Sequence, residues 1–359
     1  MINRKDIVCH PGIYIKDAID ELGLNQSEFA YRSGLSIKNV STLLNGESDV
    51  TIEVAMKLAA FFGNSVEGWI NLQTRYDVVR IKKLLNDLYK DEWQIAKQFD
   101  KDYIRDVLNV DINPEDRVNS INVLRKCFNV GTLSALKKPD LYAFHKTSIS
   151  KDLNETTIIM RNAWISLAEQ KARKIKCEPF NKEKLLSNIT NIKKMSLERP
   201  ETFIPKLKSL LSSCGIKLVI LPYLPKSNTS GITKWINNDS CVLIAINDCG
   251  KVADRFWFTL FHELGHAIKN HKRHLTISYT ENNIIDQDEL DANAFAEDNL
   301  IDKKSYLEFL NNKQFDISNI QKFAKKQNVA DFIVVGRLQK DGIISWNLYQ
   351  DRKIKYNIL

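Results

Sequence analysis

The 359-residue sequence predicts an α+β protein that is mostly helical, with a small sheet in its C-terminal half. Apolar residues mostly recur at helical spacing as far as about Phe203. After Ile204 the pattern changes to short runs rich in β-branched residues, which are typical of strands. Helices that precede a small sheet and a further long helix indicate the α+β class.

The chain is too long for one small core, so we expect three domains. These are an all-α N-terminal domain at residues 1–77, a helical connecting region at 78–200 and an α+β domain at 201–359. The N-terminus has no apolar stretch behind its charges, and the longest apolar run, near residues 216–224, is too short to span a bilayer. We therefore expect a cytoplasmic protein without a membrane segment.

The charge distribution leaves the role of the middle region open. The net charge is +8, and its excess lies between residues 77 and 215, whereas residues 1–76 carry 7 Lys and Arg against 9 Asp and Glu. A basic middle region either contacts nucleic acid or an acidic partner, or is a solvated helical surface, which is the commoner case.

The six cysteines include no C-x-x-C pair, so we expect buried or inert thiols.

The first 77 residues are expected to form short helices separated by glycines. Asn25 can cap a helix with Glu28 three residues later, which is a box-like capping pattern. Gly34 supplies a turn, and Ser36 can cap a second helix that runs to about Asn45. Two short helices joined by a tight turn predict a helix-turn-helix.

The second of these helices has the composition of a recognition helix. Val40, Leu43 and Leu44 are expected to face inward. The side chains left facing outward are those of Lys38, Asn39, Ser41, Thr42 and Asn45. Short polar groups on an exposed second helix suit the major groove of DNA, and Gln26 at the start of the first helix can contact a phosphate. The alternative is a helical bundle without a ligand, which the acidic charge of this segment favours.

The C-terminal half is expected to place a sheet beside one long helix. Strand-like runs occur at residues 216–221, 230–236 and 241–246, with a turn at 237–240 between the last two. A helix is expected from about Val252 to Asn270. If the run at 241–246 is an edge strand, a substrate chain can add to it by backbone hydrogen bonds.

The long helix contains His262-Glu263-Leu264-Gly265-His266, the H-E-x-x-H pattern. Two histidines four residues apart lie on one helix face and can present ring nitrogens to one zinc ion. Glu263 lies close enough to act as a general base on a water that zinc acidifies. Glu289 is the expected third ligand, and Asn293, four residues later, can accept the second ring N–H of a ligand histidine.

Other polar residues near the pattern are alternatives. The carboxylates that compete with Glu289 for the third ligand position are Asp286, Asp288 and Asp291. His271 and His274 belong to a basic stretch and are expected to be solvated surface residues. An incidental His and Glu pair on a surface helix remains the alternative to a metal site.

The segment from Ser230 through His266, together with Glu289-Leu-Asp-Ala-Asn-Ala-Phe-Ala296, resembles the ImmA/IrrE family of metallopeptidases. The resemblance covers about residues 200–345. It implies a zincin-like peptidase domain with His262, His266 and Glu289 as zinc ligands and Glu263 as the catalytic residue. Members of this family are zinc peptidases that cleave partner transcriptional repressors, so a regulatory protein is the implied substrate.

The N-terminal segment resembles XRE-type helix-turn-helix domains of the HigA antitoxin group. The resemblance rests on the helix-turn-helix and on its flanks, His10-Pro-Gly and residues 67–77. It implies DNA contacts by Gln26, Lys38, Asn39 and Thr42, and a partner toxin of the HigB/RelE type, which is usually an RNA-cleaving enzyme.

Three functions are consistent with these patterns. The first is a DNA-binding regulator with its own zinc endopeptidase, acting as the HigA-like antitoxin that represses its own operon. The second is a catalytically silent antitoxin or repressor in which the peptidase fold is a scaffold. The third is a peptidase that cleaves a separate repressor. Operator DNA is an expected partner in the first two, and a homodimer through the N-terminal domain is expected because such domains usually read paired half-sites.

Overall fold

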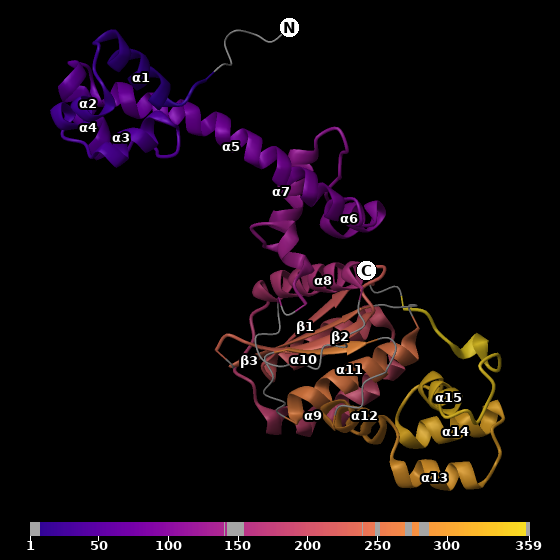
Figure 1. Ribbon diagram of the computed structural model, residues 1–359. Helices are drawn as coiled ribbons and strands as arrows, with labels where there is room; N and C mark the ends of the chain where they lie inside the picture. The colour runs from indigo at the N-terminus through magenta and orange to yellow at the C-terminus, as the bar shows by residue number, and fades with distance from the viewer. Residues whose placement is uncertain are drawn as a thin grey trace. The chain divides into compact units, whose positions relative to one another are not determined.

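The computed structural model describes residues 8–139, 141, 154–238, 240–247, 252–269, 275–279 and 287–356. The side chains of residues 82, 83, 85–87 and 275–279 are outside this description. The chain divides into two compact units, residues 1–91 and 92–359 (Figure 1). Most of the described residues are helical and one small sheet lies in the second unit, which confirms the predicted α+β class.

The first unit is a bundle of short helices around one apolar core. The helices are α1 (Pro11–Glu21), α2 (Gln26–Ser33), α3 (Ile37–Leu44), α4 (Ile52–Phe62) and the first part of α5 (Val66–Ala96). The core is built from the inward stripe of each helix, including Ile15, Phe29, Val40, Leu58 and Trp69. The helix-turn-helix is therefore confirmed as α2, a three-residue turn and α3.

The predicted capping residues act as caps. The side chain of Asn25 accepts a hydrogen bond from the Glu28 N–H at 2.9 Å, and the Ser36 hydroxyl accepts one from the Asn39 N–H at 3.1 Å. Gly34 ends α2 in the left-handed conformation, with φ of 71°. These contacts satisfy backbone groups that a helix end leaves without partners, so they fix where α2 and α3 begin.

His10 is the cap of α1. Its Nδ1 accepts a hydrogen bond from the Gly12 N–H at 2.9 Å, and its ring packs edge-on against Tyr76 of α5 with centroids 4.9 Å apart. Burial lowers the pKa of His10 below its ordinary value, against the opposing effects of Asp49 and Asp77. The cap requires the neutral imidazole, because a protonated ring has no lone pair on Nδ1.

The second unit begins with helices that lead to the sheet. They are α6 (Lys101–Leu108), α7 (Arg117–Phe128), η2 (Leu133–Lys137), α8 (Glu155–Arg173), α9 (Lys182–Lys194), η3 (Met195–Leu197) and α10 (Pro200–Ser213). Buried Glu92 fastens this region, since its carboxylate accepts two hydrogen bonds from Arg125, one from the Thr132 hydroxyl and one from the Leu133 N–H. Burial of a carboxylate is costly, and these four donated hydrogen bonds offset the cost.

The sheet has four strands in the order β1-β3-β2-β4. The strands are β1 (Ile216–Leu221), β2 (Thr229–Ile236), β3 (Cys241–Asn247) and β4 (Leu275–Tyr279). β3 pairs parallel to β1 and antiparallel to β2. The hypothesis of an edge strand at residues 241–246 is wrong, because both sides of β3 are already hydrogen-bonded. A substrate chain cannot add there, and the unforeseen strand β4 pairs with β2 instead.

Helices cover both faces of the sheet. Alternate residues of β2 point to opposite faces, so Lys234 forms an ion pair with Glu169 of α8 while Thr233 faces α11 (Ala253–Ile268). α8 also packs against β1 and β3, α10 packs against β1, and α11 packs against β2 and β3. The predicted connecting region therefore supplies one of the helices, α8, that cover the sheet.

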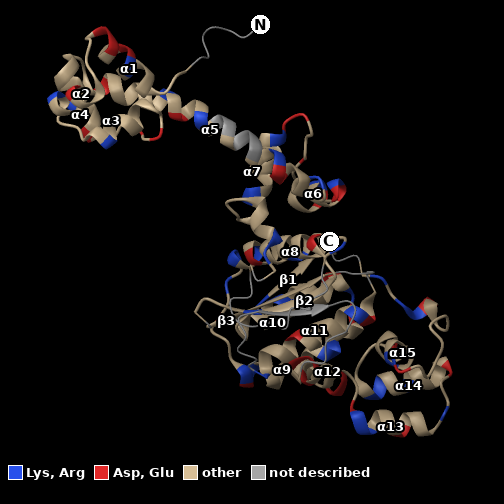
Figure 2. Ribbon diagram, viewed as in Figure 1, with Lys and Arg blue, Asp and Glu red and all other residues tan. Residues whose placement is uncertain are grey.

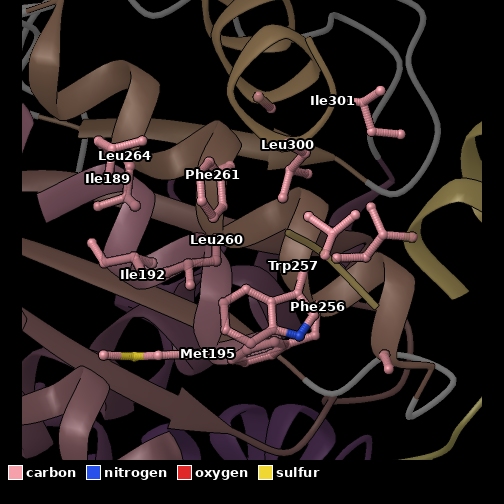
Figure 3. Close-up of a cluster of buried hydrophobic side chains, with 14 of the residues drawn as sticks. Ile189, Ile192, Met195, Phe256, Trp257, Leu260, Phe261, Leu264, Leu300 and Ile301 are labelled. Carbon is pink, nitrogen blue, oxygen red and sulfur yellow. The ribbon is translucent and has the colours of Figure 1, made fainter. Parts of the chain in front are cut away.

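The remaining helices surround α11. They are α12 (Gln287–Leu300), α13 (Lys303–Asn311), α14 (Ile317–Gln327), α15 (Asp331–Lys340) and η5 (Gln350–Arg352). The apolar sides of α11 lie in the largest described core, which includes Trp257, Leu260, Phe261 and Leu264 (Figure 3). Residues near the C-terminus hold the start of α11, since the Trp257 Nε1–H donates to the Tyr356 hydroxyl at 2.9 Å. α11 is thus fixed along its whole length.

Among the described helices, none combines the length and apolarity that a bilayer crossing needs.

The stability of the first unit should fall in mild acid because of His10. The unfolded chain takes up a proton near the ordinary pKa of 6.5, whereas the folded chain does so only at a lower pH. This contribution is therefore present above about pH 7 and is lost as the pH falls through the lowered native pKa. Hydrogen exchange of peptides from residues 8–21, corrected for intrinsic rates, measures it in the whole protein.

A His10→Asn variant is the matched control, since asparagine also caps helices but does not titrate in this range. We expect the variant to lose less protection than the parent between pH 8 and pH 5.5. Equal losses in the two proteins would show that His10 does not carry the pH dependence.

Candidate metal centre and recognition helix

One face of α11 turns three polar side chains into the protein interior. His262, Glu263 and His266 are all buried, with exposed fractions of 5%, 0% and 1%. α12 packs closely against this face, because at Gly265 an added Cβ would lie 3.1 Å from the Cα of Ala292. A side chain at residue 265 would therefore require its neighbours on α12 to shift by a few tenths of an ångström.

The close packing of α12 brings Glu289 to the two histidines. His262 Nε2 and His266 Nε2 lie 3.0 Å apart. Glu289 Oε2 is 3.3 Å from His262 Nε2, and Glu289 Oε1 is 3.2 Å from His266 Nε2. Within the described ranges, these three residues form the one group of three side chains able to hold a metal ion.

The donor set fits zinc. Two imidazole nitrogens and one carboxylate are a common set for catalytic zinc, and bonds of about 2.0–2.1 Å in a tetrahedron place ligand atoms roughly 3.3 Å apart. The closest approaches between the three side chains, 3.0 to 3.3 Å, are near this ligand spacing, with the carboxylate meeting His262 through Oε2 and His266 through Oε1. The fourth position then remains for water or substrate.

Asn293 orients the first of these histidines. Its Oδ1 lies 3.0 Å from Nδ1 of His262, and because an amide oxygen only accepts, Nδ1 must carry the proton. The lone pair of a neutral His262 is then on Nε2, which points to His266 and Glu289. This is the tautomer that a metal-binding histidine needs.

The electrostatics of the group favour a cation. Burial alone would lower the pKa of His262, but the carboxylates of Glu289 and Glu263 together raise it. Burial would likewise raise the pKa of Glu289, yet hydrogen bonds from His262 and His266 bring it down to about 2. The three side chains are thus arranged around positive charge, which either a proton or a metal ion supplies.

Glu263 is held from the sheet side by two residues that the sequence analysis did not single out. The Thr233 hydroxyl lies 2.6 Å from Glu263 Oε2 and 3.1 Å from its backbone oxygen. At Gly231 an added Cβ would lie 2.4 Å from Glu263 Oε1. The available signal was alternation, since residues 231 and 233 share the face of β2 that meets the long helix.

The alternative ligands that the structure describes are not part of this group. Asp291 accepts a hydrogen bond from the Gln287 side chain at 2.8 Å, and neither it nor Asp288 belongs to the metal-capable group. Asp286, His271 and His274 lie outside the described residues.

The candidate DNA-contacting residues lie on the helix-turn-helix as predicted from the sequence. Gln26 and Lys38 are exposed, whereas Asn39, Ser41 and Thr42 are partly buried. The Thr42 hydroxyl also bonds within the unit, 3.0 Å from the Ser48 hydroxyl and 3.2 Å from the Lys38 backbone oxygen. Lys38 is the one charged residue of α3, and acidic and basic segments are interspersed over the unit (Figure 2).

Two family models match the chain. The helix-turn-helix model matches residues 15–69, which include α2 and α3. The model of the IrrE N-terminal-like domain matches residues 213–338, which include the sheet, α11 and α12. His262, Glu263, His266, Glu289 and Asn293 all fall within the second match.

Curated relatives match over 60 to 86 residues. Virulence-associated protein A' of Dichelobacter nodosus is 34% identical over 24% of this chain and 75% of its own length. The uncharacterized HTH-type transcriptional regulator YddM of Escherichia coli is 33% identical over 21% of this chain and 81% of its own. Antitoxin HigA-1 of Vibrio cholerae is 37% identical over 17% of this chain and 56% of its own.

Thr233→Val should destabilise the second unit by about 1–3 kcal/mol, because it removes the hydroxyl that donates to a buried carboxylate oxygen. Thr233→Ser keeps the hydroxyl and is the matched control. Denaturant unfolding of both variants measures the difference, and equal stability would show that this hydrogen bond contributes little.

Gly231→Ala should displace the Glu263 carboxylate, since the new methyl group overlaps Oε1. We expect a melting temperature several degrees lower than that of the parent. Gly131→Ala is a control, because an added Cβ there meets no atom within 4 Å. Equal melting temperatures for the two variants would mean that the Gly231 contact relaxes without cost.

Proposed function

Because the chain belongs to the helix-turn-helix family of transcriptional regulators and carries an IrrE N-terminal-like domain, we propose that it is a DNA-binding regulator with an active zinc endopeptidase. The observation that carries this proposal is the buried His262, His266 and Glu289 group with Glu263 beside it. A structural zinc site usually has four protein ligands, whereas three ligands and an adjacent carboxylate suit catalysis.

The residues divide the chemistry between holding the ion and moving protons. His262, His266 and Glu289 would hold zinc, and Asn293 keeps His262 in the correct tautomer. When bound, zinc acts as a Lewis acid that acidifies water and polarises the peptide carbonyl.

Glu263 is the proton carrier in this proposal. Its carboxylate takes a proton from the attacking water and returns it to the nitrogen of the departing chain. The Thr233 hydroxyl, 2.6 Å from Glu263 Oε2, keeps the carboxylate in place between these two transfers.

We further propose that the protein is the antitoxin of a toxin–antitoxin pair. The support is the likeness of its N-terminal unit to antitoxin HigA-1 and to HTH-type regulators. In this reading the chain dimerises through the N-terminal unit, represses its own operon and binds a HigB/RelE-type toxin. The peptidase then cuts a regulatory protein in the cytoplasm, either the toxin, a separate repressor or a second copy of this chain.

Replacing Glu263 should separate metal binding from catalysis. Glu263→Gln should retain about one zinc per chain while cleavage of a co-expressed neighbouring gene product disappears, because only the base is lost. His266→Ala should lose the zinc itself. Zinc analysis and mass spectrometry of the partner proteins provide the two measurements.

Undiminished cleavage by Glu263→Gln would remove the residue from its proposed role. Full zinc content without cleavage of any neighbouring gene product by the parent protein would favour a scaffold.

Lys38→Ala should weaken operator binding for all sequences and reduce the salt dependence by about one ion, as expected for a phosphate contact. Fluorescence anisotropy on the promoter of its own operon at several salt concentrations measures both effects. Lys16→Ala, on α1, is a control of equal charge. Equal losses in the two variants would point to general charge rather than to a contact by α3.

A further inference from the structure

Two thiols meet outside the metal centre. Cys177 lies in the connection between α8 and α9, and Cys241 is the first residue of β3. Their Sγ atoms are 3.2 Å apart, although 64 positions separate them in the sequence. The spacing of the cysteines in the sequence does not predict this pair. From the sequence we expected buried or inert thiols, not two cysteines in contact.

The backbone after Cys177 is hydrogen-bonded to the end of α10 and to the residue just before β3. The Phe180 N–H donates to the Ser240 oxygen at 2.7 Å, and the Glu178 N–H donates to the Ser212 oxygen at 3.1 Å. The ring of Phe180 also packs edge-on against Trp235 of β2, with centroids 5.1 Å apart. The bond between Phe180 and Ser240 joins the segment that follows Cys177 to the residue before Cys241. The fold therefore holds the two sulfur atoms close together.

The two cysteines differ in their access to solvent. Cys241 is 5% exposed, whereas Cys177 is partly exposed and can meet a dissolved oxidant. Asn237 Nδ2 and the Ser240 hydroxyl both lie 3.8 Å from the Cys241 sulfur. Burial and the neighbouring Cys241 raise the pKa of Cys177 to about 11, with the charge of Lys217 acting in the opposite direction. Cys177 is therefore mostly a thiol at neutral pH, and an oxidant reacts with its small thiolate fraction.

We propose that Cys177 and Cys241 are an oxidative modification site, at which peroxide converts the pair into a reversible disulfide. The bond would join the α8–α9 connection to the start of β3. A disulfide needs about 2.05 Å between sulfur atoms, so the two side chains must approach by roughly 1.2 Å. This proposal does not depend on peptidase activity.

The reaction consumes one hydrogen peroxide. The Cys177 thiol first loses its proton, and the thiolate then attacks one peroxide oxygen, so an S–O bond forms, the O–O bond breaks and the departing hydroxide takes up the released proton to become water. The Cys241 sulfur then attacks the sulfenic acid, so the S–S bond forms, the S–O bond breaks and a second water leaves with the thiol proton. Two thiols are oxidised and one peroxide is reduced to two waters.

The crosslink should stabilise the second unit. It closes a loop that contains α9, α10, β1 and β2, including Thr233, which contacts Glu263. A disulfide around a loop of this size restricts the unfolded chain and should raise the melting temperature on the order of 8 °C.

Peroxide treatment of the reduced full-length protein tests the proposal. After trapping of free thiols, peptide mapping by mass spectrometry should find Cys177 joined to Cys241, with a mass loss of about 2 Da for the two hydrogens removed. Dithiothreitol should reverse both the crosslink and the rise in melting temperature. Cys127→Ser is the matched control, since Cys127 is also a partly exposed thiol and its loss should leave the crosslink intact.

Cys177→Ser and Cys241→Ser should each abolish the crosslink and the thermal shift. Recovery of Cys177 and Cys241 as free thiols, as sulfinic acids or joined to other cysteines would overturn the proposal. A crosslink that leaves the melting temperature unchanged would overturn its stabilising role.

Discussion

The second unit depends on the burial of one helix that is apolar on most sides and polar on one. Trp257, Phe261 and Leu264 fix α11 in the core, and the same packing forces His262 and His266 inside. Buried polar groups are costly unless each has a partner. The surrounding elements supply those partners, with α12 contributing a carboxylate and an amide and β2 contributing a hydroxyl.

Close approach of the backbone makes these contacts possible. Gly265 lets α12 come near enough for its side chains to reach both histidines, and Gly231 lets β2 pass beside Glu263. Each pair of the three side chains then has atoms within 3.3 Å of each other, which concentrates lone pairs in the interior. Such a group is stable only around positive charge, so the geometry itself favours a cation.

In the proposed function, the chain would join DNA recognition by its first unit to peptide cleavage by its second. The recognition helix is short and exposes one charged residue, Lys38, so affinity for DNA must draw on pairing of two copies or on charges elsewhere. The thiol pair at the start of β3 lies in the same unit as the metal centre. Its oxidation state would alter the stability of the unit without replacing any metal ligand.

The sequence by itself determined the fold class, the helix-turn-helix with its caps at Asn25 and Ser36, and the candidate metal motif, because each depends on residues close together in the chain. The roles of Glu289 and Asn293 stay predictions, although both lie against the histidines. The order of the strands, the contacts of Thr233 and Gly231 with Glu263, and the meeting of Cys177 with Cys241 were decided only by tertiary structure. They depend on which distant segments pack side by side, and local periodicity in the sequence does not predict that packing.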